Sequence, residues 1–235
     1  MNYQEFQKSI NVSKEQLYRE IYLANRDQIQ VKKEETVIRN LSRIFDAALK
    51  ISNEKGFQAM SMRDFSKETA LSMGALYSYF ASKDELLDMI LRQGRQLVVR
   101  ILNAHIQPIE DPVTKLEAAI RIHIYLSEAL QPWFYFSFME VKNMSPAEKE
   151  NTVAGELYTD QIFADILIEG QAAGHFAARD PQQSASGIKA LLQDWYVKRW
   201  KHARRQTSVD AYADFIVDFV MAYHRVSDGG KVQRS

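Results

Sequence analysis

The sequence predicts an all-α protein, and three observations support this prediction. Only 9 glycines and 5 prolines occur in 235 residues, so long stretches contain no helix breaker. Apolar residues recur with helical spacing, as at Leu41, Ile44, Phe45 and Ala48. No stretch alternates polar and apolar residues for long enough to require a β-strand. We therefore expect helices joined by short connections.

Polar residues mark where these helices begin. In capping-box-like patterns, a side-chain oxygen accepts a hydrogen bond from the first turn, and an acid or amide reaches back. Such patterns begin at Ser13, Ser61, Ser82, Ser145 and Thr207. Asp111-Pro112 and Asp180-Pro181 add two starts with proline at the first helical position. The predicted helices cover about 14–31, 35–55, 61–69, 73–80, 82–107, 112–130, 133–142, 146–173, 181–205 and 208–226.

The composition excludes several classes of protein. With no cysteine, the chain has no disulfide framework, thiolate metal site or cysteine nucleophile. A formal net charge of zero argues against coating nucleic acid by bulk charge, but permits a local contact surface. The sequence has neither a signal-peptide pattern nor an apolar run near the ~20 residues that span a bilayer. We expect a soluble, cytoplasmic protein without membrane contact.

Residues 61–80 are the most informative about function. They are predicted to form two short helices joined by a tight connection, in which Phe65 and Ala70 pack against Leu76 and Phe80. This is the geometry of a helix-turn-helix, whose second helix enters a DNA groove. Gly74 near the start of the second helix costs up to ~1 kcal/mol relative to alanine. That cost is understandable if a DNA backbone comes very close.

The exposed face of the second helix supplies the predicted DNA contacts. Tyr77 and Tyr79 are expected to be exposed, with hydroxyls that reach phosphate oxygens, and Lys83 adds a charge at the next helix N-terminus. Met73 and Ala75 suit thymine methyl groups. The predicted DNA-binding residues are Ser61, Arg63, Ser72, Met73, Gly74, Ala75, Tyr77, Ser78, Tyr79 and Lys83.

Residues 44–87 resemble the DNA-binding head of the TetR family of bacterial transcriptional regulators. The matching pattern is an apolar helix, Gly56-Phe57, Ser61 to Ala70, Ser72, Gly74, Leu76-Tyr77, Tyr79-Phe80 and Ser82 to Leu86. Leu71 and Met73 depart from it, since valine and a polar or basic residue are usual there. The resemblance implies a homodimer whose two recognition helices enter successive major grooves of a palindromic double-stranded DNA operator, most simply as a repressor.

The rest of the chain predicts a ligand-binding and dimerising body. Residues 166–176 resemble the end of a long helix in this family, and the last two helices lie where the family forms its dimer interface. Wide apolar stripes support this, one including Leu191 and Trp195 and the other running from Phe215 to Tyr223.

A short aromatic segment at 131–141 predicts one wall of an effector pocket. Its apolar residues face nearly all sides of a helix, whereas a core helix needs only one apolar stripe. The effector is expected to be a hydrophobic small molecule, with acyl-CoA thioesters as candidates; packing into the core is the alternative for each residue. The predicted ligand-binding residues are Leu102, Ile120, His123, Ile124, Phe134, Tyr135, Phe138, Met139, Tyr158, Ile162 and Trp195.

Two segments keep alternative interpretations. The basic run from Lys198 to Arg205 would hold the phosphates of a coenzyme A ester or form a solvated helix face. The N-terminal helix would pack on the head through Leu17, Ile21 and Ala24, or contact DNA as an arm.

The sequence does not predict an enzyme. It contains none of the common hydrolase, phosphate-loop or metal-binding motifs, and its histidines show no i,i+4 pairing. No catalytic residue, metal or cofactor is therefore expected. A helical protein-interaction adaptor without DNA binding is the alternative function. The predicted segments are an N-terminal extension at 1–34, a helix-turn-helix domain at 35–84, a ligand-binding and dimerisation domain at 85–227, and a disordered tail at 228–235.

Overall fold

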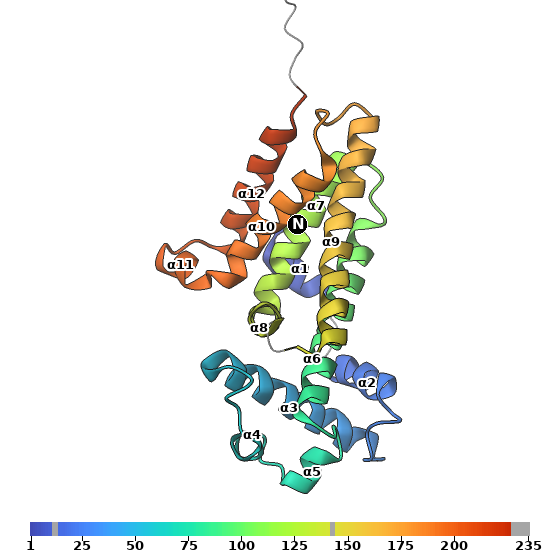
Figure 1. Cartoon of the computed structure of the whole chain (residues 1–235). Helices are drawn as coiled ribbons and strands as arrows, with labels where there is room; N and C mark the ends of the chain where they lie inside the picture. Colours follow the sequence, from blue (N-terminus) through green and yellow to red (C-terminus); the bar gives the residue numbers. More distant parts are fainter. Residues whose placement is uncertain (11–13, 142–143, 227–235) are drawn as a thin grey trace, which may run out of the picture. The chain divides into compact units, whose positions relative to one another are not determined.

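The computed structural model describes residues 1–10, 14–141 and 144–226, so the expected tail at 228–235 lies outside the described residues. Every regular element in these ranges is a helix, which confirms the predicted all-α fold (Figure 1). The helices are α1 (Tyr3–Ser9), α2 (Lys14–Ala24), α3 (Glu34–Lys55), α4 (Met62–Thr69), α5 (Met73–Tyr77), α6 (Lys83–Ile106), α7 (Pro112–Ala129), α8 (Gln131–Glu140), α9 (Pro146–Ala172), α10 (Pro181–Val197), α11 (Arg199–Arg204) and α12 (Val209–His224).

Most of the predicted capping residues start helices. Ser61 Oγ accepts from Asp64 N at 3.1 Å, and the Asp64 carboxylate accepts from Ser61 N at 3.3 Å. Backbone N–H groups are likewise accepted by Ser82 (3.1 Å), Asp111 (2.8 Å), Ser145 (3.2 Å), Asp180 (2.9 Å) and Ser208 (3.1 Å). At the last helix the cap is Ser208 rather than Thr207, and the expected cap Ser13 lies outside the described residues.

The predicted helix at 181–205 is broken. Lys198, with φ −112° and ψ 36°, separates α10 from α11. In a straight helix, residues seven apart are about 10.5 Å apart along the axis. The rings of Trp195 and His202 are nevertheless 4.9 Å apart, and His202 also packs on Tyr212 at 4.7 Å. The break therefore lets α11 fold back onto the aromatic cluster.

The described residues form two compact units. We call the first the head unit, which comprises Gln7–Leu97 and Leu130–Val153. The second, the body unit, comprises Met1–Phe6, Val98–Ala129 and the residues from Ala154 onward. This division differs from the predicted segments, because α8 and the first turns of α6 and α9 belong with the head.

The core of the head unit forms where α3 packs against α2, α4 and α8. Tyr18 of α2 packs edge-on against Phe45 of α3 at 5.7 Å between ring centroids. Ile21 and Tyr22 are also buried, so α2 packs on the head as one of the two N-terminal interpretations expected. Ala24 is exposed, in contrast to that expectation, because α2 ends there rather than at residue 31.

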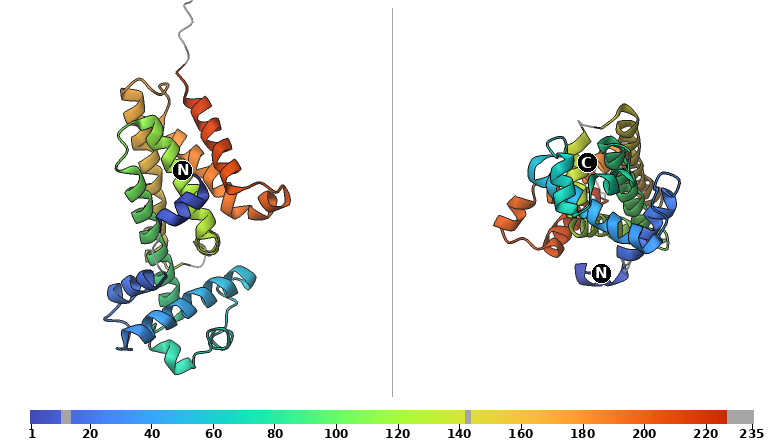
Figure 2. Two further views of the ribbon diagram at one scale, coloured as in Figure 1. Left: turned by 180° about the vertical axis from the view of Figure 1, so that it is seen from behind. Right: turned by 90° about the horizontal axis from the view of Figure 1, so that it is seen from below.

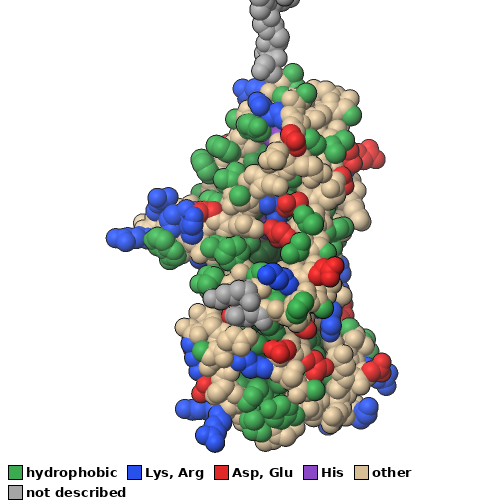
Figure 3. Space-filling view, in the orientation of Figure 1, with side chains coloured by type: hydrophobic (Ala, Val, Ile, Leu, Met, Phe, Trp, Pro, Cys, Tyr) green, Lys and Arg blue, Asp and Glu red, His purple; other side chains and the backbone are tan. Residues whose placement is uncertain are grey.

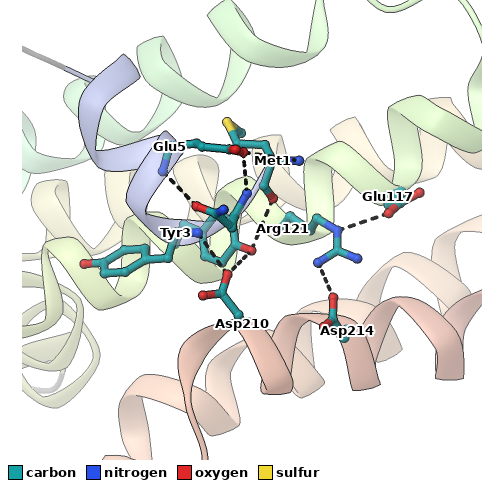
Figure 4. A network of polar contacts seen from close by, with 9 residues as sticks. Met1, Tyr3, Glu5, Glu117, Arg121, Asp210 and Asp214 are labelled. Atoms are coloured by element: carbon teal, nitrogen blue, oxygen red, sulfur yellow. Dashed lines mark hydrogen bonds and ion pairs between the residues drawn. The ribbon is translucent and has the colours of Figure 1, made fainter.

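In the body unit, α7 lies against α10 and α12 (Figure 2). The first residues of the chain, for which no helix was predicted, cover part of this bundle. Asp210 Oδ1 accepts from Tyr3 N at 2.9 Å (Figure 4). The same oxygen accepts from the Tyr125 hydroxyl at 2.7 Å. Phe6 is fully buried, with its ring 5.6 Å from that of Tyr125.

No helix in the described ranges is long and apolar enough to cross a membrane.

Replacing Phe6 by alanine should test whether these first residues stabilise the body unit. Removing a fully buried phenylalanine ring costs on the order of 3–5 kcal/mol, through lost burial and the cavity left behind. We expect a clearly lower melting temperature for Phe6→Ala than for the exposed control Gln4→Ala, measured by calorimetry. Equal melting temperatures for the two variants would show that Phe6 contributes little.

Candidate DNA-binding surface and effector-binding body

The turn between α4 and α5 fixes the direction of the second helix. Ala70 adopts the left-handed conformation, with φ 49° and ψ 37°. Thr69 stabilises this turn, since its hydroxyl donates to Phe65 O at 2.8 Å and accepts from Leu71 N at 3.3 Å. The two helices therefore form a helix-turn-helix with a defined connection.

The inner face of α5 packs as predicted except for Ala70, which was expected to pack there but is exposed because it forms the left-handed turn after α4. Leu76 is fully buried, and the Phe80 ring lies 6.0 Å from that of Phe65. Ser72 caps the helix by accepting from Ala75 N at 3.2 Å, and the Ser78 hydroxyl donates to Ala75 O at 2.6 Å.

The outer face of α5 is open to solvent. Ser72, Met73, Gly74 and Tyr77 are exposed, and Ala75 and Ser78 are partly buried. Ser61 and Arg63 at the start of α4 are exposed too. These predicted DNA-binding residues all lie on α4, α5 or their caps.

Tyr79 differs from the prediction. It was expected to be exposed, but its side chain is 1% exposed and its hydroxyl accepts from Asn40 Nδ2 at 2.8 Å. Burial raises the pKa of this hydroxyl. The reason is that α5 ends at Tyr77, so the chain turns and directs Tyr79 into the head core. The prediction of an exposed Tyr79 was therefore wrong.

Lys83 has a role inside the head unit. Its ammonium donates to the carbonyl oxygens of Gln58 and Met60, both at 3.0 Å, and lies 5.1 Å from the centre of the Phe57 ring. Burial lowers the pKa of this amine. Lys83 thus holds the loop that precedes α4, and substituting it would disturb the head as well as any phosphate contact.

Gly74 is not required by packing within the chain. A Cβ atom at this position would meet nothing within 4 Å. The absence of a side chain therefore leaves the helix surface open for a close approach from outside.

Basic residues that the sequence analysis did not single out lie beside this surface. Gln30 N donates to Ser78 O at 2.9 Å, so the segment before α3 reaches the end of α5. Lys32 and Lys33, which follow directly, are exposed and have no ionic partner in the described part of the chain. A basic pair two residues from a contact with α5 is suited to neutralise phosphates. The only sequence signal was the pair itself, next to the start of α3.

The predicted effector-binding residues fall in both units. In the body unit Leu102, Ile120, Ile124 and Trp195 are fully buried, His123 is 2% exposed, Ile162 is partly buried and Tyr158 is exposed. Trp195 is held by its own fold, since its indole N–H donates to Glu128 at 2.9 Å and its ring stacks on Tyr212 at 4.9 Å. These contacts account for its burial without a ligand.

The four predicted residues of α8 lie in the head unit. Phe134 is buried and Tyr135 is partly buried, whereas Phe138 and Met139 are 45% and 43% exposed. The aromatic excess of this helix is thus explained in part by core packing, because Phe136 packs edge-on against Phe57 at 5.9 Å. Phe138 and Met139 remain as an exposed apolar pair.

Two contacts fasten α8 within the head. The Trp133 indole fits against α6 at Gly94, where a Cβ would overlap the ring, and its N–H donates to Ile90 O at 3.1 Å. At the other end, the buried Glu140 carboxylate accepts from Ser52 Oγ at 3.2 Å and from Phe57 N at 3.0 Å. The second contact joins α8 to the end of α3 and the loop that leads into the helix-turn-helix.

The basic run is largely engaged in contacts within the body unit. Glu128 accepts two bonds from Arg199, each at 3.1 Å, and Asp194 contacts Lys198, Lys201 and His202 at 3.3, 2.5 and 2.9 Å. Lys and Arg side chains gather over α11 in Figure 3, where Arg204 and Arg205 are exposed. Three of the five Lys and Arg side chains of this run therefore pair with acids of the body unit, which favours the structural interpretation of this run.

An apolar surface lies along α10 and α12. Phe215, Phe219 and Tyr223 of α12 are 59%, 53% and 50% exposed. Beside them, a groove of ≈ 390 Å³ runs between the two helices. It is lined by Asp180, Gln183, Ser184, Gly187, Ile188, Leu191, Phe219, Val220, Tyr223 and His224. Large rings in a row on an exposed helix are unusual for a surface that faces only water.

Comparison with known proteins places both parts of the chain. Residues 44–90 match the model for bacterial regulatory proteins of the tetR family, and residues 110–223 match the tetracyclin repressor-like C-terminal domain. The HTH-type transcriptional regulator BetI of Rhizobium meliloti strain 1021 is 23% identical over 194 residues, which cover 80% of this chain and 91% of BetI.

Solved structures share the fold. A tetR-family regulatory protein from Rhodococcus RHA1 has a TM-score of 0.74 at 22% identity, covering 80% of this chain and 98% of its own. AibR, solved in complex with isovaleryl coenzyme A and operator DNA, has a TM-score of 0.69 at 20% identity, covering 77% of this chain and 97% of its own.

Substitutions at Gly74 should separate folding from DNA binding. Gly74→Ala should raise the free energy of unfolding by up to ~1 kcal/mol, because alanine favours the helix and its Cβ has space. Binding to duplex DNA should weaken, and weaken further in Gly74→Leu, because the added atoms keep the DNA backbone away. Fluorescence anisotropy and thermal melts measure the two quantities, with the exposed Leu23→Ala of α2 as control. Full DNA affinity in Gly74→Leu would contradict this interpretation of the surface.

Proposed function

The chain belongs to the TetR family of bacterial regulatory proteins, and on that premise we propose that it is a homodimeric repressor released from a palindromic operator by a hydrophobic small molecule. DNA binding and transcription regulation follow from the family and are not part of the proposal. Family membership also argues against the alternative of a helical adaptor without DNA binding. The observation that carries the proposal is the coexistence of an exposed recognition helix with an unpaired apolar face on α10 and α12.

Dimerisation is supported by geometry and by the limits of one recognition helix. A five-residue helix reaches only a few base pairs, so operator-level specificity needs two copies about 34–36 Å apart on the duplex. The exposed rings Phe215, Phe219 and Tyr223 supply the apolar area that a second copy would bury. A two-fold dimer through α10 and α12 would place the same groove on both sides of the interface.

Ligand sensing is supported by how α8 is fastened. Phe138 and Met139 present an apolar pair to a ligand, and the same helix ends at Glu140, which accepts bonds from Ser52 and Phe57 of the head. A ligand that moves α8 would therefore act on the loop before the helix-turn-helix. Coenzyme A esters are the first candidates because AibR, a neighbour in fold, was solved with isovaleryl coenzyme A and operator DNA.

Charge placed in the apolar face should prevent dimerisation. Phe215→Glu and Phe219→Glu put an anion where two apolar faces would meet, and burying an unpaired carboxylate costs several kcal/mol. We expect monomers in analytical ultracentrifugation and a loss of tight binding to a selected palindrome. Trp200→Glu is the matched control, since Trp200 is 67% exposed on α11 outside the groove. A stable Phe219→Glu monomer with full operator affinity would refute the assigned interface.

An effector should lower operator affinity through α8. Acyl-CoA esters of increasing chain length, titrated into the complex with the selected operator, should weaken binding by roughly 5–150-fold, which corresponds to a coupling of ~1–3 kcal/mol. Phe138→Gln should remove this response because it weakens ligand binding. Glu140→Gln should leave ligand binding intact and reduce the response. Calorimetry of ligand binding distinguishes the two. If a ligand binds tightly and operator affinity does not change, the sensing mechanism is wrong although DNA binding stands.

A further inference from the structure

A lysine lies buried inside the body unit. Lys189 of α10 is 5% exposed, and its ammonium is surrounded by groups from α7 and α9. It donates to Thr159 Oγ1 at 2.8 Å, lies 3.4 Å from Glu156 Oε2, and approaches His123 Nε2 at 3.5 Å. Of these residues only His123 was among those predicted from the sequence to bind a ligand.

Packing alone does not explain this ammonium. Removing a charge from water is expensive, and a well-packed apolar side chain of similar volume is often as stable as a buried ion pair. On the same helix as His123, Ile120 and Ile124 are both fully buried, and the His123 ring lies 6.5 Å from that of Phe163. A methionine at this position would have no ammonium to desolvate, so the apolar packing around it does not require the charge.

The compensation of this charge within the chain is partial. The Glu156 side chain is 47% exposed, and its other oxygen accepts from Gln193 at 2.8 Å, so this carboxylate can leave Lys189 for water without losing all its contacts. His123 supplies no negative charge, and burial together with the Lys189 charge holds its pKa well below the usual range. Thr159 offers Lys189 only a hydroxyl oxygen, since its proton is donated to Glu156 O at 2.8 Å.

We propose that Lys189 is the anchor for a carboxylate at the end of the alkyl chain of an effector, which replaces Glu156 on the ammonium. This rests on the proposed function, in which the effector is a hydrophobic small molecule. Thr159 and His123 would position the ammonium, and the buried isoleucines of α7 would face the apolar part of the ligand. The carboxylate is either the head group of a free alkanoic acid or the far end of a dicarboxylic acyl thioester.

The charges nearby are compatible with this exchange. Asp160, one residue after Thr159, accepts from Ser186 Oγ at 3.4 Å, and burial raises the pKa of its carboxyl. A second anion added to this cluster would be repelled by both acids. Replacing Glu156 adds none, because one carboxylate leaves the ammonium as another arrives.

The test compares two pairs of probes that differ in a carboxylate. The first pair is decanoate and decan-1-ol, and the second is decanedioyl-CoA and decanoyl-CoA. Calorimetry with the full chain should show that the carboxylate member of at least one pair binds about tenfold or more tightly, as expected for a charge-assisted hydrogen bond. Lys189→Met should abolish this preference, and Glu156→Gln should increase affinity for the carboxylate because it frees the ammonium.

Control variants separate this role from a structural one. Lys115→Met removes another lysine of the body unit, one that pairs with Glu169 at 3.0 Å, and should leave the preference unchanged. Thermal melts establish that Lys189→Met is folded, and Lys189→Gln serves if it is not. A preference that persists without Lys189, or the lack of any preference in both pairs, overturns the proposal.

Operator binding distinguishes this proposal from the proposed function. Probes that bind through Lys189 and leave operator affinity unchanged would refute sensing but keep the site. A response of operator affinity to esters that is independent of Lys189 would refute the Lys189 site and support sensing.

Discussion

The head has to fix the orientation of a helix that is too short to be stable on its own. α5 has five residues, far fewer than the roughly 12–15 that an isolated helix needs in water, so its orientation depends on its contacts with the rest of the head. Leu76 and Phe80 bury its inner face, Ser72 caps its start, and Thr69 fixes the turn before it. With the inner face committed to packing, the outer face is free to consist of small and polar residues. The open space at Gly74 is a consequence of this separation.

The same requirement extends to α8. A buried carboxylate that accepts a backbone N–H, as Glu140 accepts from Phe57 N, costs free energy if the partner is removed, so the pair restricts both segments. Trp133 against Gly94 adds a steric contact, since only glycine allows the indole to lie on α6. Helix α8 and the loop that leads into the helix-turn-helix therefore restrain each other's position. An apolar pair at Phe138 and Met139 on such a helix is better placed to affect the head than one on a surface loop.

The parts of the structure that the sequence predicted are those determined locally. Capping residues act within one turn, and so Ser61, Asp111 and Asp180 mark their helices correctly. Contacts between distant residues were not visible. The hydroxyl of Tyr79 accepts a hydrogen bond from Asn40, thirty-nine residues away, and the ammonium of Lys83 donates to the carbonyl of Gln58. A tyrosine or a lysine looks the same in the sequence whether its partner is a DNA phosphate or another residue of the chain.

The N-terminus and α11 were missed for a related reason. Residues 3–9 are too few and too polar to predict a helix, and the burial of Phe6 depends on Tyr125, which lies on α7. The break at Lys198 likewise depends on Tyr212, because its ring and that of Trp195 provide the surface on which His202 packs. In each case a ring far along the chain decides the local conformation.

Lys189 shows how a functional position can be visible in a helical pattern and still be overlooked. Along α10 the buried residues Ala185, Ile188, Leu192 and Trp195 define the inward stripe, and Lys189 lies within it. A charged residue in an inward register is rare, since lysine is almost never fully buried unless it is paired. Periodicity identifies the exception but not its partner, which is supplied by Thr159 and Glu156 on α9. The buried charge on α10 and the fully buried isoleucines of α7 describe an effector with an alkyl chain that ends in a carboxylate, which is more specific than the hydrophobic effector that composition alone suggested.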